Sequence, residues 1–99
     1  MPIAELQVTE GSRDGARAVA VRGELDIQTA PDLTACLHAH RGETVVLDLT
    51  HLRFCDSCGL RALVCERREA EIAGGELTIV LPDEGPVRRI FEVTGLVPE

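Results

Sequence analysis

Hydrophobic and polar residues alternate through the first part of the chain in the pattern of two β-strands. Residues Ile3 to Thr9 place apolar and polar side chains on opposite sides, which is typical of a strand with one buried face. A cluster of turn-forming residues, Gly11 to Gly15, follows, and Ala16 to Arg22 then has the pattern of a second strand. We therefore predict an antiparallel hairpin.

The next segment has the periodicity of an amphipathic helix. Thr29 and Pro31 are typical of a helix start, because a threonine hydroxyl can accept a hydrogen bond from a free backbone N–H and proline is tolerated in the first turn. Four side chains then recur at helical spacing on one face: Leu33, Cys36, Leu37 and His40. Gly42 is expected to end this helix.

A third strand and a second helix are predicted in the middle of the chain. Residues Thr44 to Leu49 form an apolar run with little alternation, which is typical of an interior strand covered on both faces. The helix that follows should end at Gly74 and Gly75. Its apolar side is predicted to hold Leu60, Leu63, Val64, Cys65 and Ile72. Its solvated side is predicted to hold Arg61, Glu66, Arg67, Arg68, Glu69 and Glu71.

The last segment predicts one more strand and one more helix. The strand is expected at Leu77 to Leu81, and the helix is expected to begin near Pro86 and to be closed by Gly95. Leu96 should fold back onto that helix as the hydrophobic contact that accompanies such a cap. The buried face of the helix is predicted to hold Val87, Ile90, Phe91 and Thr94.

These elements follow one another as β-β-α-β-α-β-α, which predicts a single α/β domain over residues 1–99. Strands joined through helices should be parallel and connected by right-handed crossovers, while the first strand lies antiparallel beside the second. The result is a mixed sheet of four strands or more with helices packed against it. Asp26 and the pair Asp56 and Ser57 follow neighbouring parallel strands, so they are expected at the same edge of the sheet.

Composition and charge narrow the class of partner. The chain is 44% hydrophobic with two aromatic residues, which predicts an aliphatic core, and its net charge of −7 argues against nucleic acid or an anionic membrane surface as the main partner. A protein partner is favoured. The first residues have neither a basic flank nor a long apolar run, so we expect a cytoplasmic protein, in which the four cysteines are reduced thiols.

The stretch from Phe54 to Leu60 is the main candidate for chemistry. It places Ser57 directly after Asp56 and two residues before Gly59, where a strand gives way to a helix, and backbone N–H groups at such a position lack intrahelical partners. A structural role is the alternative: Ser57 could cap the helix, and Asp26 and Asp56 could simply form turns. We favour partner contacts for both aspartates. The sequence has no Walker-type glycine loop, so we expect no bound nucleotide or other cofactor.

Cys55 and Cys58 leave two further alternatives open. A strand, a C-x-x-C motif and a helix are also the layout of a thioredoxin-like redox site. A zinc site built from Cys55, Cys58 and His51 would lack a fourth ligand. The redox hypothesis leaves the other patterned segments of the chain unexplained, and the chain has no tryptophan.

Three blocks of sequence together resemble the STAS domain family, and more narrowly its bacterial anti-sigma factor antagonists. They are Gly23 to Asp26 with Thr29 and Ala30; Val46 to Leu49 with Phe54 to Leu60; and Pro86 to Phe91 with Thr94 to Leu96. The blocks span nearly the whole chain in the family's order. Cys58 stands where a second serine is usual, and the sequence ends at Glu99, before a final strand and helix that many members carry.

The resemblance implies a partner switch that controls sigma-dependent transcription. In this family the serine directly after the aspartate, here Ser57, is phosphorylated by an anti-sigma factor that is itself a serine kinase. The unphosphorylated protein binds that kinase and frees sigma, the phosphorylated protein does not bind, and a serine phosphatase resets the switch. The expected partner-binding residues are Asp26, Asp56, Ser57, Cys58, Gly59 and Leu60. The domain itself would be no enzyme and would be a monomer or a weak homodimer. A constitutive subunit of a larger signalling or lipid-transport complex is the alternative within the same fold.

Overall fold

The computed structural model describes residues 5–95, in which a four-stranded sheet carries three helices. In chain order the elements are β1 (Leu6–Arg13), β2 (Ala16–Leu25), α1 (Ala30–Ala39), β3 (Thr44–Cys55), α2 (Ser57–Ile72), β4 (Glu76–Val80) and α3 (Pro86–Val93). The predicted order β-β-α-β-α-β-α and the mixed α/β class are both confirmed.

The strands lie side by side in the order β1-β2-β3-β4, with β1 antiparallel to β2 and the other pairs parallel. Asp14 and Gly15 form the two-residue hairpin turn, in which both φ angles are positive (52° and 84°). β1 extends as far as Arg13, so the turn is shorter than the predicted Gly11 to Gly15. The predicted start of this strand at Ile3 lies outside the described residues, as does Leu96.

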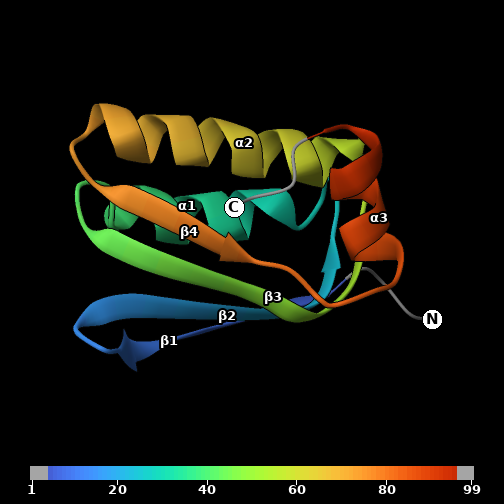
Figure 1. Cartoon of the computed structure of the whole chain (residues 1–99), viewed down its shortest axis with the longest axis horizontal. Helices are drawn as coiled ribbons and strands as arrows, with labels where there is room; N and C mark the ends of the chain where they lie inside the picture. The colour runs from blue at the N-terminus through green and yellow to red at the C-terminus, as the bar shows by residue number, and fades with distance from the viewer. Residues whose placement is uncertain (1–4, 96–99) are drawn as a thin grey trace.

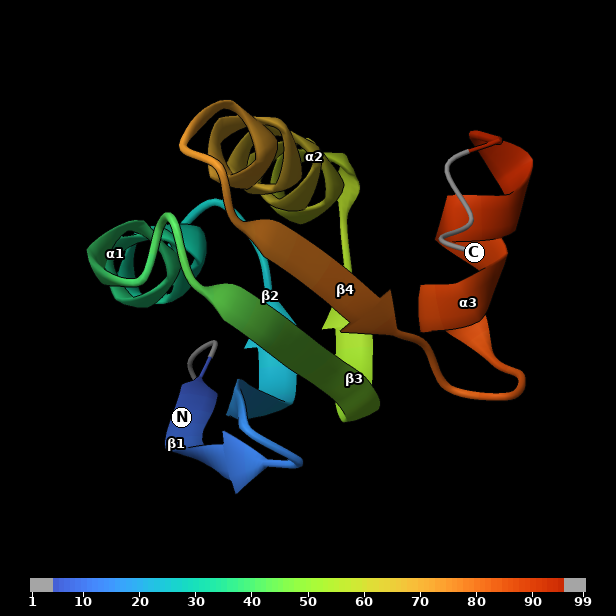
Figure 2. The same cartoon turned by 60° about the vertical axis from the view of Figure 1, so that its left-hand side comes forward.

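Helices α1 and α2 lie over the same face of the sheet, and α3 packs against β3 (Figures 1 and 2). Both crossovers step in the same direction across the sheet, so the right-handed rule places both helices on one face. β3 consequently alternates: Val45, Leu47 and Leu49 are buried, whereas Val46 and Asp48 between them are only half-buried. The prediction that this strand is covered on both faces is wrong.

The core between the helices and the sheet is aliphatic, as predicted, with one aromatic ring. Its most completely buried side chains come from β2, β3 and each of the three helices. They are Phe91, Leu25, Leu33, Leu47, Leu49, Leu63, Val19, Val21 and Val87.

The buried side of α2 differs in part from the prediction. It consists of Gly59, Leu60, Leu63, Glu66 and Ala70. Cys65 is exposed and Ile72 is 72% exposed, although both were predicted on the apolar side. Glu66 was predicted to be solvated but is 5% exposed, because the Arg41 guanidinium, just after α1, donates to its two carboxylate oxygens at 2.8 and 3.3 Å.

Candidate functional site

The carboxyl ends of β2 and β3 lie beside each other and bring the predicted site residues to one edge of the sheet. Leu25 and Cys55, the last residues of the two strands, are paired. The backbone N–H of Asp56 then donates to the carbonyl of Leu25 at 3.2 Å. Asp26 and Asp56 therefore follow neighbouring strand ends, as the sequence predicted.

Asp56 is the N-cap of α2. Its backbone is extended (φ −94°, ψ −177°), and its Oδ1 accepts a hydrogen bond from the backbone N–H of Gly59 at 2.9 Å. The helix begins at the next residue, Ser57, whose side chain is exposed. The capping role that was the structural alternative for Ser57 thus belongs to Asp56, and the serine hydroxyl is left at the surface.

Asp26 and Thr29 stabilise the turn between β2 and α1 by reciprocal hydrogen bonds. Asp26 Oδ1 accepts from the backbone N–H groups of Gln28 (2.9 Å) and Thr29 (3.0 Å). Thr29 Oγ1 accepts from the backbone N–H of Asp26 at 3.0 Å and donates to the carbonyl of Glu24 at 2.8 Å. The prediction that the Thr29 hydroxyl caps α1 is wrong, because that hydroxyl is engaged with the preceding turn. Asp26 is a turn former here, and a partner contact by it stays a prediction.

The first turn of α2 packs tightly against β2 and β3. A Cβ at Gly59 would lie 2.8 Å from the backbone oxygen of Leu25 and 3.2 Å from Cys55 Sγ. Leu60 is 4% exposed. Of the predicted partner-binding residues in α2, Gly59 and Leu60 therefore have a packing role, whereas Ser57 and Cys58 are exposed.

Two exposed apolar side chains flank this edge and were not recognised from the sequence. Ile27, next to Asp26, is 71% exposed, and Phe54, next to the last residue of β3, is 45% exposed. Single exposed apolar side chains are common, whereas apolar patches rimmed by polar residues mark surfaces that bind proteins. Ile27 could have been noticed because it stands between polar residues outside any periodic segment. Phe54 is one of only two aromatic residues in the chain.

The C-x-x-C motif does not have the properties of a thioredoxin-like site. Cys55 is buried, and burial together with the negative charge of Asp56 raises the pKa of its thiol to about 12. A redox-active dithiol needs a thiol whose pKa is lowered. All four cysteines are free, and Cys58 is exposed.

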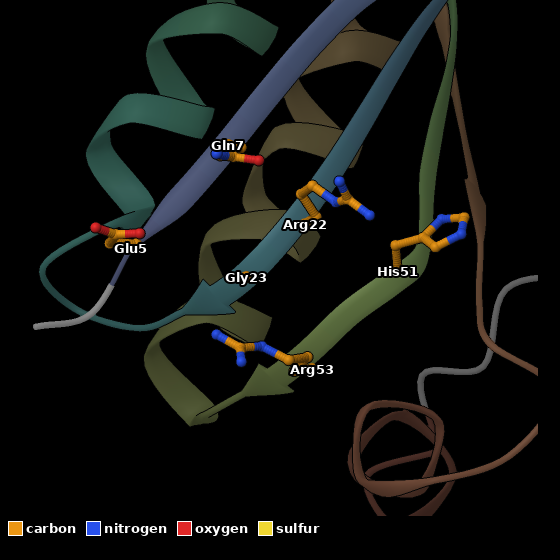
Figure 3. Close-up of a pocket in the computed structure, with 6 residues that line it drawn as sticks. All are labelled: Glu5, Gln7, Arg22, Gly23, His51 and Arg53. Atoms are coloured by element: carbon orange, nitrogen blue, oxygen red, sulfur yellow. The ribbon is translucent and has the colours of Figure 1, made fainter. Parts of the chain in front are cut away.

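The zinc hypothesis for His51 also finds no support in the geometry. Over residues 5–95, the ligand atoms of His51, Cys55 and Cys58 do not gather into one group. His51 instead lines a shallow hollow of about 330 Å³ on the face of the sheet opposite α1 and α2 (Figure 3). The hollow is lined by Glu5, Gln7, Arg22, Gly23, His51 and Arg53. Its side chains are spread along three strands and do not converge on one point, so they do not form an enclosed ligand site.

Comparison with known proteins shows the family to which the chain belongs. The family model for the STAS domain matches residues 7–99. The chain belongs to the STAS domain family. None of the helices in the described part of this STAS domain has both the length and the apolar character needed to cross a membrane.

Several proteins to which the chain is similar are named anti-sigma factor antagonists. The anti-sigma F factor antagonist of Paenibacillus polymyxa is 30% identical, over 92% of this chain and 80% of its own. A solved anti-sigma factor antagonist from Mycobacterium paratuberculosis is also 30% identical, with a TM-score of 0.80 over 93% of this chain and 80% of its own. SpoIIAA has been solved in an unphosphorylated form (26% identity, TM-score 0.70, 93% and 82% covered) and, from Bacillus, in a phosphorylated form (27%, 0.60, 93% and 85%).

Proposed function

We propose that this STAS domain is an anti-sigma factor antagonist that binds a serine-kinase anti-sigma factor and is switched off by phosphorylation of Ser57. The observation that carries the proposal is the position of Ser57, exposed at the first residue of α2 while Asp56 supplies the cap. Its hydroxyl can be esterified without removing the hydrogen bond that starts the helix. Relatives named as anti-sigma factor antagonists, one of them solved in a phosphorylated form, support the same conclusion.

The proposed docking surface consists of Asp26, Ile27, Phe54, Asp56, Ser57 and Cys58. Ile27 and Phe54 supply apolar area, and the aspartates supply charge. Both aspartates are held by hydrogen bonds within their own turns, so little conformational freedom is lost when a partner binds. A kinase partner would bring the nucleotide, since the sequence has no phosphate-binding loop of its own.

Phosphorylation would change this surface in both charge and bulk. A phosphoserine adds about −1.5 to −2 charges and three acceptor oxygens. The new charge would stand beside the Asp56 carboxylate in a chain that already carries −7. Inverting a bound population from 99:1 to 1:99 takes about 5.5 kcal/mol, and one like-charge contact at about 4 Å supplies roughly 4 kcal/mol at an effective dielectric of 20. One acidic or tightly packed partner group opposite Ser57 would therefore account for most of the switch.

Phosphoryl transfer gives the direct test. Each serine-kinase anti-sigma factor of the source organism is incubated with the domain and ATP, and the product is analysed by intact mass and peptide mapping. We expect one phosphate on the wild type and on Ser12→Ala, which removes the only other serine, and none on Ser57→Ala. Ser57→Glu should bind the kinase at least tenfold more weakly than Ser57→Ala. A serine phosphatase should restore binding to the modified protein.

The opposite result would favour the constitutive alternative. Tight binding to a kinase that leaves the mass of the domain unchanged, with equal affinity for Ser57→Ala and Ser57→Glu, would refute the switch. The domain would then be a permanent subunit of a larger signalling or lipid-transport complex. Sedimentation at several concentrations tests the predicted monomer or weak homodimer.

A matched pair of isoleucines tests where the partner docks. Ile27 and Ile72 are equally exposed, at 71% and 72%, but Ile72 is the last residue of α2, at the end of the helix away from Ser57. We expect Ile27→Ser to weaken kinase binding about tenfold, which corresponds to roughly 1.4 kcal/mol, and Ile72→Ser to leave it unchanged. Equal effects of the two substitutions would place the interface elsewhere.

A further inference from the structure

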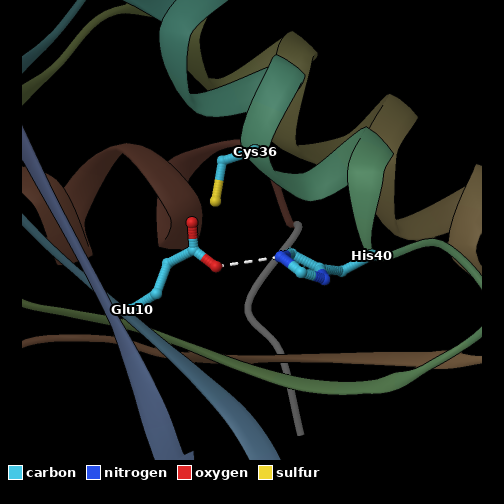
Figure 4. Close-up of side chains that lie close together, drawn as sticks. All are labelled: Glu10, Cys36 and His40. Carbon is cyan, nitrogen blue, oxygen red and sulfur yellow. Dashed lines mark hydrogen bonds and ion pairs between the residues drawn. The ribbon is translucent and has the colours of Figure 1, made fainter.

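Three side chains with different metal-ligating groups converge between β1 and α1. Glu10 comes from β1, while Cys36 and His40 lie one turn apart on the same face of the α1 end. One ligand atom from each residue lies within 4.8 Å of the other two. Figure 4 shows the carboxylate, the thiol and the imidazole pointing toward one another, with His40 Nε2 2.9 Å from Glu10 Oε1.

A second carboxylate orients the imidazole of this group. Glu43 Oε2 lies 3.1 Å from His40 Nδ1, and Glu43 Oε1 accepts a hydrogen bond from Arg17 Nε at 3.0 Å. The Nδ1 contact leaves Nε2 directed at Glu10. A carboxylate on the far nitrogen of a histidine is the usual arrangement around metal-bound imidazoles, where it fixes the ring and the tautomer.

We propose that Glu10, Cys36 and His40 form a binding site for a divalent cation of the zinc class. Thiolate, imidazole and carboxylate together suit Zn²⁺ and Co²⁺, whereas Mg²⁺ and Ca²⁺ select oxygen ligands. Zinc binds these groups at about 2.0 to 2.3 Å, so tetrahedral geometry needs ligand atoms about 3.3 to 3.8 Å apart. The three ligand atoms lie within 4.8 Å of one another, and the 2.9 Å contact between Glu10 and His40 has to open slightly to reach that spacing.

Coordination would release two protons to solvent, the one between His40 Nε2 and Glu10 Oε1 and the thiol proton of Cys36, and would leave one position open. The Cys36 S–H bond breaks as the sulfur binds the cation, and the proton passes to solvent. Three protein ligands leave the fourth position of a tetrahedral ion to water. The site lies at the end of α1 away from the Asp26 turn, so a metal here would fasten the edge strand β1 to α1 and is independent of the switch at Ser57.

Cobalt spectroscopy on the whole, reduced, chelator-treated chain tests the proposal. Titration with CoCl₂ should give one bound ion, a thiolate-to-cobalt charge-transfer band and the intense visible bands of a four-coordinate ion, all abolished by ZnCl₂. Cys36→Ser should lose the charge-transfer band. Cys65→Ser, which removes an exposed thiol on α2, should keep it.

Variants of His40 and Glu43 distinguish a specific metal site from incidental cobalt binding elsewhere on the surface. His40→Gln should weaken cobalt binding at least tenfold, whereas His38→Gln, on the exposed side of the same helix, should not. Glu43→Gln, a positioning change, should weaken it about 10- to 100-fold. Circular dichroism of the metal-free variants checks their folding. The proposal is overturned if no cobalt binds at micromolar concentrations, if the band survives in Cys36→Ser, or if folded His40→Gln binds as tightly as wild type.

Discussion

The cap of α2 can be separated from the charge that supplies it, because asparagine keeps the acceptor oxygen of Asp56 and loses only the charge. Asp56→Ala removes the 2.9 Å hydrogen bond from the Gly59 N–H and also the negative charge at the start of the helix. Loss of an N-cap side chain costs about 0.5 to 2 kcal/mol, and a charge at a helix N-terminus contributes roughly 0.3 to 1 kcal/mol. Asp56→Ala should therefore lower the free energy of unfolding by about 1 to 2 kcal/mol.

Asp56→Asn should lose only the smaller part of that stability. Asparagine caps helices about as well as aspartate, so we expect a loss of about 0.3 to 1 kcal/mol. The backbone hydrogen bond from Asp56 to Leu25 is present in every variant. Urea unfolding followed by far-UV circular dichroism measures the differences, and for a domain of this size 1 kcal/mol corresponds to about 4 to 8 °C in Tm.

A surface aspartate provides the control for these two variants. Asp83→Ala, in the exposed loop before α3, should change stability by no more than about 0.5 kcal/mol. If Asp56→Asn lost as much stability as Asp56→Ala, the capping hydrogen bond would not be the contribution of Asp56 to stability. Kinase binding then gives a second readout: a stable Asp56→Asn that binds at least tenfold more weakly would assign the charge itself to partner recognition.

Three further substitutions or treatments test the packing around the site. Gly59→Ala would set a Cβ 2.8 Å from the backbone oxygen of Leu25, so urea unfolding should show a loss of about 1 to 3 kcal/mol despite the better helix propensity of alanine. Cys55, whose pKa is raised to about 12, should be alkylated by iodoacetamide far more slowly in the native protein at pH 7 than in urea, and equal rates by mass spectrometry would contradict its burial. Arg41→Met should destabilise the protein more than Glu66→Met, because only the former leaves a buried carboxylate without its partner; thermal melting in the opposite order would contradict that account.

The edge that carries Ser57 could be predicted because it depends on connectivity. Once two strands are joined through a helix, a right-handed parallel crossover follows, and the strand ends meet at one edge. Asp26 and Asp56 were placed together on this basis, and the hydrogen bond between Asp56 and Leu25 confirms it. The same rule would also have predicted one uncovered face, since both crossovers step in one direction. The apolar run Thr44 to Leu49 pointed to the opposite conclusion, because Val46 is apolar although only half-buried.

The sequence alone could not show which of several suitable side chains caps a helix or which charged side chain is buried. Asp56 and Ser57 are both good N-caps, and the bond from the Asp56 N–H to the β2 end decides between them by holding Asp56 in an extended conformation. Glu66 was assigned to solvent because a carboxylate is rarely buried alone. Its partner Arg41 is 25 residues away, so no local pattern reveals the pair.

The two turns at the proposed docking surface explain why the proposed switch would act on partner binding and not on the fold. The Asp26 turn is closed by Thr29, and the start of α2 is closed by Asp56, so neither depends on the hydroxyl of Ser57. Phosphate at Ser57 would also meet the positive end of the α2 dipole, which partly offsets its repulsion from Asp56 within the domain. The fold is therefore expected to be similar in both states, and the difference in free energy falls on the contact with the partner. Because the rest of the surface would be fixed before binding, the affinity for the partner would depend on the one group that changes, the hydroxyl or phosphate of Ser57.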